Sequence, residues 1–582
     1  MHSIIWATLC AGLGAAAGSG DTWSLVRRAD PASPITLHLT LNLPETSRSL
    51  EQVVSEVSDP DHPRFRQYLT ARELQYALQP PAQHVNEIAA WLKQHSVSGF
   101  DTRGHMVEAS MNVSQADQLL DAKYCVYSDG TRETIRTESY HIPEHIRNYV
   151  LSVSPTTTFP CPSKPRPAQA GSDESQSLTK RTGCGSDDNT TPDCIRQIYN
   201  ITYTAQPNRT TFAVYATEAA SYSASDLQKY LQQYNPAAAS ANAAFEVVGS
   251  GDPSEGSPGV EGAFETHLDT QASLGLAWPA KGILYNLGGV FGPEPGVTYD
   301  PFVRFLQDLI HNETVPSVVS FSESMPEDQV DPAYARSLCN MMAQIGTRGV
   351  TLVFSSGNNG PQGDKPSGTH KAIFEPEFPA SCPYVLAVGG TTNLADETAA
   401  TQSTITGVIA KLSYTASGGG FSNLFPFPDY QQPDQPIYMR DHVPVSYRSL
   451  SGYSSNGRGI PDVSAFSTNF PVVYNGATVP ISGTSAAAPT WAAVIALLND
   501  YEASKCRPPL GFVNPWLYKY ASSGILKDIT TGGNNAGKCE QTSGCSLSQT
   551  PGYDVTPGWD AVTGLGSPIV SAMIEALDCK PR

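Results

Sequence analysis

The feature that most constrains the fold is the alternation of short apolar runs with helical patterns over about 400 residues after residue 181. Each apolar run has the length and composition of a strand that is buried on both faces. Strands that alternate with helices in this way predict a parallel sheet covered by helices on both sides. The clearest runs are 211–215, 282–287, 317–321 and 350–355, and the clearest helical patterns are 334–348 and 486–499.

A smaller α/β unit is predicted in front of this region, within residues 33–155. Its expected strands are 35–43 and 106–110, and its expected helices are 51–57 and 85–95. Residues 155–181 are rich in Pro, Ser, Thr and Gln, which is typical of a linker. This linker ends in Lys180 and Arg181, a dibasic pair that a secretory-pathway processing protease could cleave.

The first 17 residues read as a secretory signal peptide, because an apolar stretch ends in the small residues 15–17. The stretch is too short to span a membrane, so a membrane anchor is the weaker interpretation. Secretion predicts disulfides among the eight cysteines after residue 181, and the short loops favour Cys184–Cys194 and Cys539–Cys545. Glycosylation sequons also fit this route; they occur at Asn112, Asn189, Asn200, Asn208 and Asn312.

Charge restricts the partners. The net charge is −19, and most of the acidic surplus follows residue 181. Nucleic acid is therefore disfavoured, because a phosphate backbone needs a basic face. An acidic protein of this kind would stay soluble, and many of its carboxylates would become neutral in acid.

Ser485 is the candidate nucleophile. It lies among small residues in Ser482–Pro489, directly before an apolar helical pattern, so its hydroxyl is expected near a helix N-terminus. Backbone amides at such an end can stabilise a developing oxyanion. The alternative is a serine that merely caps the helix.

Glu265 and Asp269 are the second candidate pair. Positions i and i+4 lie on one face of a helix, and two neighbouring carboxyls can share a proton and act as an acid/base pair. A solvated acidic face is the alternative interpretation. His267, between them, also allows a Ser/His/Asp reading, although none of the histidines after residue 181 has a His-Gly-Thr-His context.

These motifs together resemble those of the sedolisins, the serine-carboxyl peptidases that include fungal and lysosomal tripeptidyl-peptidases. Further matching segments are 378–381, 388–391, 417–423, 558–560 and 563–564, and residues 58–60 and 68–70 resemble the family's prodomain. The resemblance implies a subtilisin-like catalytic domain with a parallel central sheet flanked by helices, preceded by a ferredoxin-like α/β prodomain. It divides the chain into a signal peptide (1–17), prodomain (18–154), linker with processing site (155–181) and catalytic domain (182–582).

The resemblance also implies roles for individual residues. Ser485 matches the nucleophile, Glu265 the general base and Asp269 the carboxyl group that orients Glu265. A carboxyl pair can still exchange protons at pH values where histidine is fully protonated, so activity in acid is expected. Asn358 stands where the family typically carries an oxyanion-hole Asp. An amide donates a hydrogen bond at any pH, so we expect Asn358 to extend activity towards neutral pH.

A structural calcium ion is implied near the C-terminus. The matching ligands are two carboxylates and three backbone carbonyls, which form a hard-oxygen set suited to Ca²⁺. They are Asp528, Ile529, Thr556, Gly558 and Asp560. Two turn-forming aspartates are the alternative interpretation.

The expected activity is that of a secreted, extracellular acid peptidase, a monomer with no membrane or nucleic-acid partner. Its partners would be peptide or protein substrates and its own prodomain, which should inhibit it. Release of N-terminal tripeptides is the leading prediction, and Glu323 could hold a substrate α-amine. An endopeptidase of the same fold and a catalytically inactive binding homologue are the alternatives.

Overall fold

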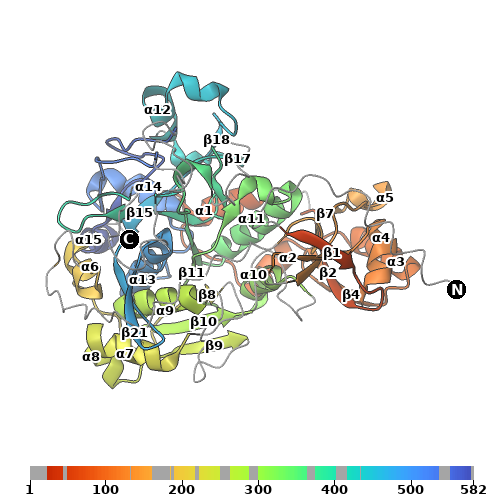
Figure 1. Cartoon of the computed structure of the whole chain (residues 1–582), viewed down its shortest axis with the longest axis horizontal. Coiled ribbons are helices and arrows are strands. Elements are labelled where there is room, and N and C mark those ends of the chain that lie inside the picture. Colours follow the sequence, from red (N-terminus) through yellow and green to blue (C-terminus); the bar gives the residue numbers. More distant parts are fainter. Residues whose placement is uncertain are drawn as a thin grey trace.

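A central sheet organises the larger part of the molecule (Figure 1). The computed structural model describes residues 23–43, 49–130, 133–159, 184, 189–216, 222–249, 263–287, 299–363, 374–400, 416–432, 434–535 and 551–578. The sheet has the strand order β16-β15-β13-β11-β8-β10-β9, and β19 also pairs with β15. Every pairing is parallel except that of β16 with β15. The strands are β8 (Thr211–Ala216), β9 (Phe245–Gly249), β10 (Lys281–Asn286), β11 (Val318–Phe321), β13 (Thr351–Ser355), β15 (Leu386–Thr392), β16 (Thr398–Ala399) and β19 (Val463–Phe466). The parallel sheet predicted from the apolar runs is thus confirmed.

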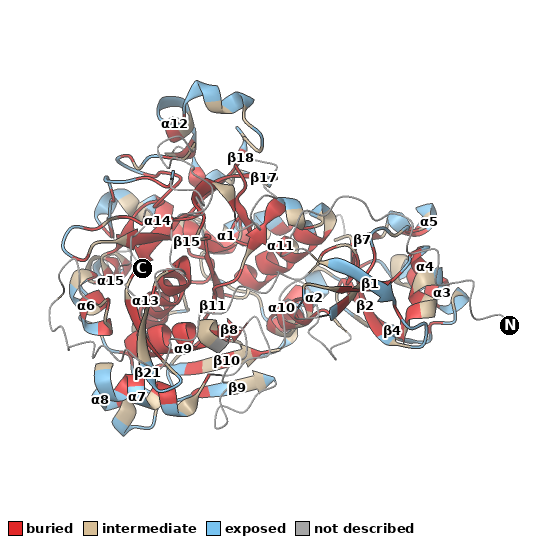
Figure 2. Ribbon diagram, in the orientation of Figure 1, coloured by how far each residue is buried: buried red, intermediate tan, exposed pale blue. Residues whose placement is uncertain are grey.

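Helices cover both faces of this sheet, because successive side chains of a strand point to opposite sides. In β8, Phe212 and Val214 belong to the core beneath α9 and α13, whereas Ala213 and Tyr215 belong to the core beneath α10 and α11. Figure 2 shows α13 and α9 buried along most of their length in the middle of this body. The flanking helices are α6 (Pro192–Ile198), α7 (Ala224–Tyr234), α8 (Pro236–Ser240), α9 (Ala263–Ala277), α10 (Pro301–His311), α11 (Pro332–Thr347), α13 (Thr484–Ser504), α14 (Asn514–Tyr520) and α15 (Val570–Asp578).

Shorter elements lie outside the central sheet. Two-stranded pairings join β12 with β14, β17 with β18, β20 with β21 and β22 with β23. Their bounds are β12 (Met325–Pro326), β14 (Glu377–Phe378), β17 (Gly420–Pro426), β18 (Gly457–Ile460), β20 (Phe470–Tyr474), β21 (Ala477–Ile481), β22 (Leu526–Lys527) and β23 (Ser567–Pro568), with α12 (Asp434–Asp441) and the 3₁₀ turn η1 (Glu327–Gln329). None of the helices in the described ranges is long and apolar enough to cross a membrane.

The N-terminal part forms a separate lobe, red to orange in Figure 1, with its own hydrophobic core. Its antiparallel sheet has the order β3-β4-β2-β7, and the chain order β2-α3-β3-β4-α4-β7 is that of a ferredoxin-like unit. The elements of this lobe are β1 (Ser24–Arg28), β2 (Pro34–Leu41), α3 (Ala82–Gln94), β3 (Gly99–Arg103), β4 (Met106–Asn112), α4 (Val113–Leu120), β5 (Cys125–Ser128), β6 (Glu133–Arg136), α5 (Glu144–Arg147) and β7 (Val150–Ser154). Two further helices of the N-terminal part, α1 (Leu50–Ser58) and α2 (Ala71–Ala77), pack on the larger body, α1 against α11 and α14 and α2 against α10 (Figure 1).

The connection between α1 and α2 fastens this lobe to the larger body. The Arg66 guanidinium pairs with the carboxylate of Glu502, which is fully buried on α13, and donates to the carbonyl of Pro509. The Tyr68 hydroxyl donates to the carbonyl of Leu510 over 2.7 Å. The Tyr68 ring also lies against Gly511, where a methyl group would come within 2.3 Å of the phenol oxygen. The contact therefore combines the Arg66–Glu502 ion pair with close packing of the Tyr68 ring against the backbone of Gly511.

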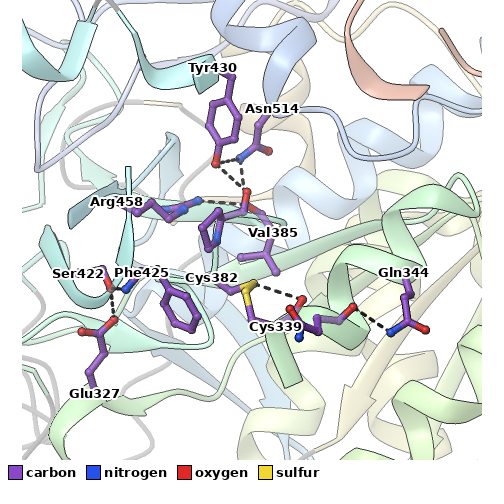
Figure 3. The surroundings of a disulfide bond; sticks show 12 residues. Glu327, Cys339, Gln344, Cys382, Val385, Ser422, Phe425, Tyr430, Arg458 and Asn514 are labelled. Atoms are coloured by element: carbon purple, nitrogen blue, oxygen red, sulfur yellow. Dashed lines mark hydrogen bonds between the residues drawn. A yellow bond between two sulfur atoms is a disulfide. The ribbon is translucent and has the colours of Figure 1, made fainter. Parts of the chain in front are cut away.

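Two disulfides lie within the described ranges. Cys184–Cys194 confirms the short-loop prediction, whereas Cys539 and Cys545 lie outside the described residues. Cys339–Cys382, which was not predicted, joins α11 to the segment before β15, and Figure 3 shows its surroundings. The predicted signal peptide and the Lys180-Arg181 pair also fall outside the described residues. Of the predicted linker, residues 155–159 are described, and there the Thr158 carbonyl accepts a hydrogen bond from Arg136 Nε.

Candidate active site

Ser485 is the second residue of α13 and is 4% exposed. The alanines that follow Ser485 are fully buried and take little room at the start of this helix. Pro489 lies one turn further along and has no amide hydrogen for the Ser485 carbonyl, which a helix would otherwise bond from position i+4. The Ser485 carbonyl instead lies 3.4 Å from the hydroxyl of Ser322.

Glu265 and Asp269 lie one turn apart on α9, which packs against α13. Asp269 is 2% exposed and Glu265 is partly buried. The Ser322 hydroxyl donates to Asp269 Oδ1 over 2.7 Å and thus lies between the carboxyl group of α9 and the start of α13. The structure therefore brings the predicted carboxyl helix and the predicted nucleophile helix together around one shared serine.

Ser322 is a functional residue that sequence reasoning missed. It directly follows β11, at the carboxyl edge of the parallel sheet where the ends of adjacent strands meet. Of residues 320–323, the sequence identifies only Glu323, as a residue that could hold a substrate α-amine. The position of Ser322 at the end of a strand, before a polar run, was the signal that could have identified it.

Removing the Ser322 hydroxyl should weaken catalysis without removing it. Ser322→Ala takes one hydrogen bond from a buried carboxyl group, and such a bond is worth about 1.5–3 kcal/mol, so kcat/KM is expected to fall about 10- to 100-fold. Steady-state kinetics on a peptide substrate measures the effect, with Ser322→Thr as the rescuing variant. Ser317→Ala, at the far end of the same strand run, is the control, and an equal loss there would contradict the prediction.

Asn358 faces the turn into α13. Its Oδ1 accepts the backbone N–H of Thr484 over 2.7 Å and the Thr484 hydroxyl over 3.0 Å. Both contacts occupy the carbonyl side of the amide and leave its NH₂ group to donate elsewhere. A methyl group on Gly483 would lie 3.6 Å from the Asn358 amide nitrogen, so this donor is next to the Ser485 turn. The arrangement suits an oxyanion donor.

A glycine-rich segment runs beside Asn358. Ala416 N–H donates to the Asn358 carbonyl over 3.0 Å, and Gly418 N–H donates to the Gly357 carbonyl over 2.8 Å. A side chain at Gly418 has no space, because its Cβ would lie 2.0 Å from the Ser356 carbonyl oxygen. The backbone around the candidate oxyanion donor is thus held by close main-chain pairing.

The buried carboxyl group of Glu327 anchors the continuation of this segment. Glu327 Oε1 accepts from the Ser422 hydroxyl over 2.5 Å and Oε2 accepts from the Asn423 N–H over 2.7 Å, as Figure 3 shows for Ser422. Burial raises the pKa of Glu327, and the hydrogen bonds to it oppose that shift. Glu327 was not identified from the sequence.

His267 has surroundings that differ from those of a catalytic base. Its Nε2 accepts the backbone N–H of Ser223 over 3.0 Å, and its ring packs edge-on against Tyr474 of β20. Nε2 also lies 3.5 Å from the Asp226 carboxylate. These contacts direct the ring towards α7 and the β20–β21 hairpin, so the Ser/His/Asp alternative has no support from this geometry.

The predicted calcium ligands gather around the turn 556–560. Asp528 Oδ2 accepts the N–H of Gly558 over 2.8 Å, and Asp560 Oδ2 accepts the N–H of Thr556 over 3.2 Å. Asp560 is fully buried, and this burial raises its pKa to about 7. Ile529 is also buried. Within the described ranges, no group of three or more His, Cys, Asp or Glu side chains could hold a metal ion, so a site here would depend on backbone oxygens.

The described sequons lie on or near the surface. Asn200, Asn208 and Asn312 are exposed and Asn189 is partly exposed. Asn200 Nδ2 donates to the Ser571 hydroxyl. Asn112, in contrast, accepts the N–H of Gln115 and caps α4.

The chain is similar to known families and proteins. Residues 21–159 match the family described as Pro-kumamolisin, activation domain, and residues 262–509 match the Subtilase family. The chain is 31% identical to the probable tripeptidyl-peptidase SED2 of Arthroderma benhamiae, across 96% of this chain and 94% of that protein. It is 30% identical to the tripeptidyl-peptidase sed4 of Aspergillus fumigatus, across 94% of this chain and 93% of that protein. Among solved structures, a Pseudomonas sedolisin in complex with pseudo-iodotyrostatin matches with a TM-score of 0.48 and 22% identity, over 67% of this chain and 98% of that one.

Proposed function

Because the chain belongs to the sedolisin family of serine-carboxyl peptidases, we propose that it is a tripeptidyl-peptidase that removes tripeptides from free N-termini in acid. The observation that carries the proposal is the relationship to tripeptidyl-peptidases along 96% of the chain. The meeting of α9 and α13 around Ser322 supports it, since it brings Asp269 and Ser485 to one hydroxyl.

In the proposed mechanism, Ser485 Oγ attacks the scissile carbonyl and its proton passes to Glu265. Asp269 holds Glu265 in place and shares the proton, while Ser322 fixes the Asp269 carboxyl. The Asn358 NH₂ group and backbone amides at the start of α13 donate to the oxyanion. Glu265 then returns the proton to the leaving amine, and water hydrolyses the acyl-enzyme by the reverse sequence, releasing the tripeptide.

The test is mass spectrometry of the products from a free-amine peptide and from its N-acetylated copy, at pH 4 and pH 7. A tripeptidyl-peptidase releases the first three residues of the free peptide and leaves the blocked peptide intact. Internal cleavage of both peptides would instead favour an endopeptidase of the same fold. Absence of cleavage by the processed protein would favour an inactive binding homologue.

The amide at Asn358 should extend activity towards neutral pH. An aspartic acid donates a hydrogen bond to the oxyanion only while protonated, whereas asparagine donates at every pH. Asn358→Asp is therefore expected to keep activity near pH 4 and to lose about 10²-fold or more of kcat towards neutral pH. The pH profile of kcat measures this change, and an alkaline limb that coincides with the parent's would refute it.

The chain is also proposed to bind one structural Ca²⁺ through Asp528, Asp560 and the carbonyls of Ile529, Thr556 and Gly558. The two carboxyls adjoin one turn, and a cation there would offset the cost of burying Asp560. The ion would stabilise the fold and take no part in the chemistry.

Removal of calcium should accordingly lower the melting temperature. A ligand at about 100 times its Kd stabilises by roughly 2.7 kcal/mol, which corresponds to a Tm change on the order of 3 °C for a domain of this size. Calorimetry with and without a chelator measures the shift. Asp528→Asn should abolish the response to calcium, whereas the exposed Asp396→Asn should keep it. A Tm that is insensitive to chelation in the parent would contradict the site.

A secreted precursor is proposed as the source of the enzyme. The disulfide Cys184–Cys194 fits an oxidising compartment, and the match of residues 21–159 to an activation domain fits an inhibitory prodomain. Processing is proposed at Lys180-Arg181, and N-glycosylation is proposed at Asn189, Asn200, Asn208 and Asn312. N-terminal sequencing and glycosidase treatment of the protein recovered from culture medium test these assignments.

A further inference from the structure

The turn between β3 and β4 inserts into the face that the larger body presents to the N-terminal lobe. Gly104 takes a left-handed conformation there, with φ of +58°, and the ring of His311 on α10 packs over it. The next residue, His105, is 3% exposed and meets Gln344 of α11. One imidazole of the prodomain is thus enclosed between two helices of the catalytic part.

The hydrogen bonds around Gln344 require His105 to be neutral. Gln344 Nε2 lies 3.2 Å from the carbonyl of Asn340, an acceptor, which identifies that end of the amide as the NH₂ group. The same nitrogen lies 3.3 Å from His105 Nε2, which must therefore accept. Protonation of His105 would place an N–H donor against an N–H donor in a buried site.

Electrostatics in this contact also oppose a charge on His105. Burial, together with the neighbouring His311, lowers the pKa of His105 to about 4. The pKa of His311 is itself lowered, by burial and by the nearby Arg103 and Arg348. In acid, two imidazolium groups would face each other among these guanidinium groups.

Glu108 and Arg304 form a second charged pair across this contact. Glu108 of β4 accepts from Arg304 of α10 over 3.1 Å and lies 3.7 Å from Nε2 of His38. A hydrogen bond to His38 and the nearby cations lower the pKa of Glu108, so this carboxylate stays ionised into acid. The remaining facing charge, Asp308 of α10, pairs with Arg304 on its own helix. Burial raises the pKa of Asp308, whose ion pair with Arg304 lies within α10 and does not join the two lobes. The Glu108–Arg304 pair across the contact persists in mild acid, whereas charging of His105 and His311 opposes the contact.

We propose that the Gly104–His105 turn is an acid-operated latch, in which protonation of His105 releases the prodomain from α10 and α11. The inference rests on the proposed peptidase function, because release would uncover the enzyme in the pH range where its carboxyl pair works.

The size of the effect follows from proton linkage. Because the pKa of His105 is lowered in the docked state, the neutral imidazole favours docking. This contribution to docking is fully present well above pH 6.5, the ordinary pKa of histidine, and it falls by up to tenfold per pH unit until about pH 4. Docking should therefore weaken about 80-fold between pH 6.5 and pH 4 through His105 alone.

The experiment follows opening of the interface in the full-length precursor carrying Ser485→Ala, so that the readout needs no peptidase activity. Ser337, on α11, donates to Thr40 of β2 and is 1% exposed. The thiol introduced by Ser337→Cys reacts with a dipyridyl disulfide when the lobes separate, and peptide mass spectrometry gives the labelling rate at that position. Variants are compared at equal pH, so the intrinsic reactivity of the thiol cancels.

In the otherwise native precursor, protection of this thiol should fall by about 80-fold from pH 6.5 to pH 4. His105→Gln should reduce that fall to less than about tenfold, and the exposed His145→Gln should leave it unchanged. Gln344→Glu should also blunt the fall, since a carboxylate would stabilise the charged imidazole. Should His105→Gln already label rapidly at pH 7, because its packing fails, Gln344→Glu decides alone. Opening of both variants at the parent's pH would overturn the latch, whatever the outcome of the product analysis.

Discussion

Ser485→Ala is expected to lower kcat by about 10⁶-fold, the loss typical when a serine peptidase of this architecture loses its nucleophile. The remaining rate would come from binding and from the oxyanion donors. The substitution removes one oxygen at the start of α13, so the melting temperature should change little. Active-site titration and kcat on a free-amine peptide measure the effect.

Ser482→Ala is the matched control for this prediction. Ser482 lies three residues earlier on the same turn, and its hydroxyl accepts the N–H of Asn469 over 3.1 Å. We expect it to cost less than about tenfold in kcat, as a structural hydrogen bond would. A Ser485→Ala enzyme with more than 1% of the parent's rate would remove Ser485 from the role of nucleophile.

Glu265→Gln is expected to lower kcat by about 10³- to 10⁴-fold, because an amide of the same shape cannot take the proton of Ser485. The loss should come with a change in the pH profile. A base must be deprotonated to act, so the parent's activity rises with pH through the titration of the carboxyl pair. In Glu265→Gln this acid limb should be lost.

Glu246→Gln provides the comparison for this second prediction. Glu246 lies on β9 and forms an exposed ion pair with Lys281, away from α13. Its substitution should alter neither kcat nor the profile. An acid limb of unchanged shape in Glu265→Gln would show that another group accepts the proton.

The strands of the central sheet could be predicted because burial on both faces leaves an uninterrupted apolar run. The predicted strands 211–215 and 350–355 correspond to β8 and β13, and their predicted ends differ from the observed ends by at most one residue. The two-residue strands β12 and β14 could not be predicted, because they pair through main-chain contacts that leave no periodicity. The pairing of β12 with β14 matters for the site, because the turn that follows β12 carries Glu327.

The candidate site could be predicted where its functional residues lie close together in the sequence. Glu265 and Asp269 share a helix face through their spacing, and the small residues around Ser485 mark a tight turn. Ser322 could not be found in this way, because its partner Asp269 is 53 residues away and the two meet through the sheet. The disulfide Cys339–Cys382 could not be predicted for the same reason, because its cysteines are 43 residues apart. Cys184–Cys194 could be predicted because it closes a short loop.

The contacts of Arg66 and Tyr68 with the larger body have a consequence for the lifetime of the mature protein. These side chains bond the carbonyls of Pro509 and Leu510 and complement a buried carboxylate. Once the prodomain has been removed, these interactions are no longer part of the chain. A mature molecule would have to keep its fold without these contacts, and the lifetime of such a protein can be governed by the height of its unfolding barrier. The quantity that describes it is a half-life at a given temperature.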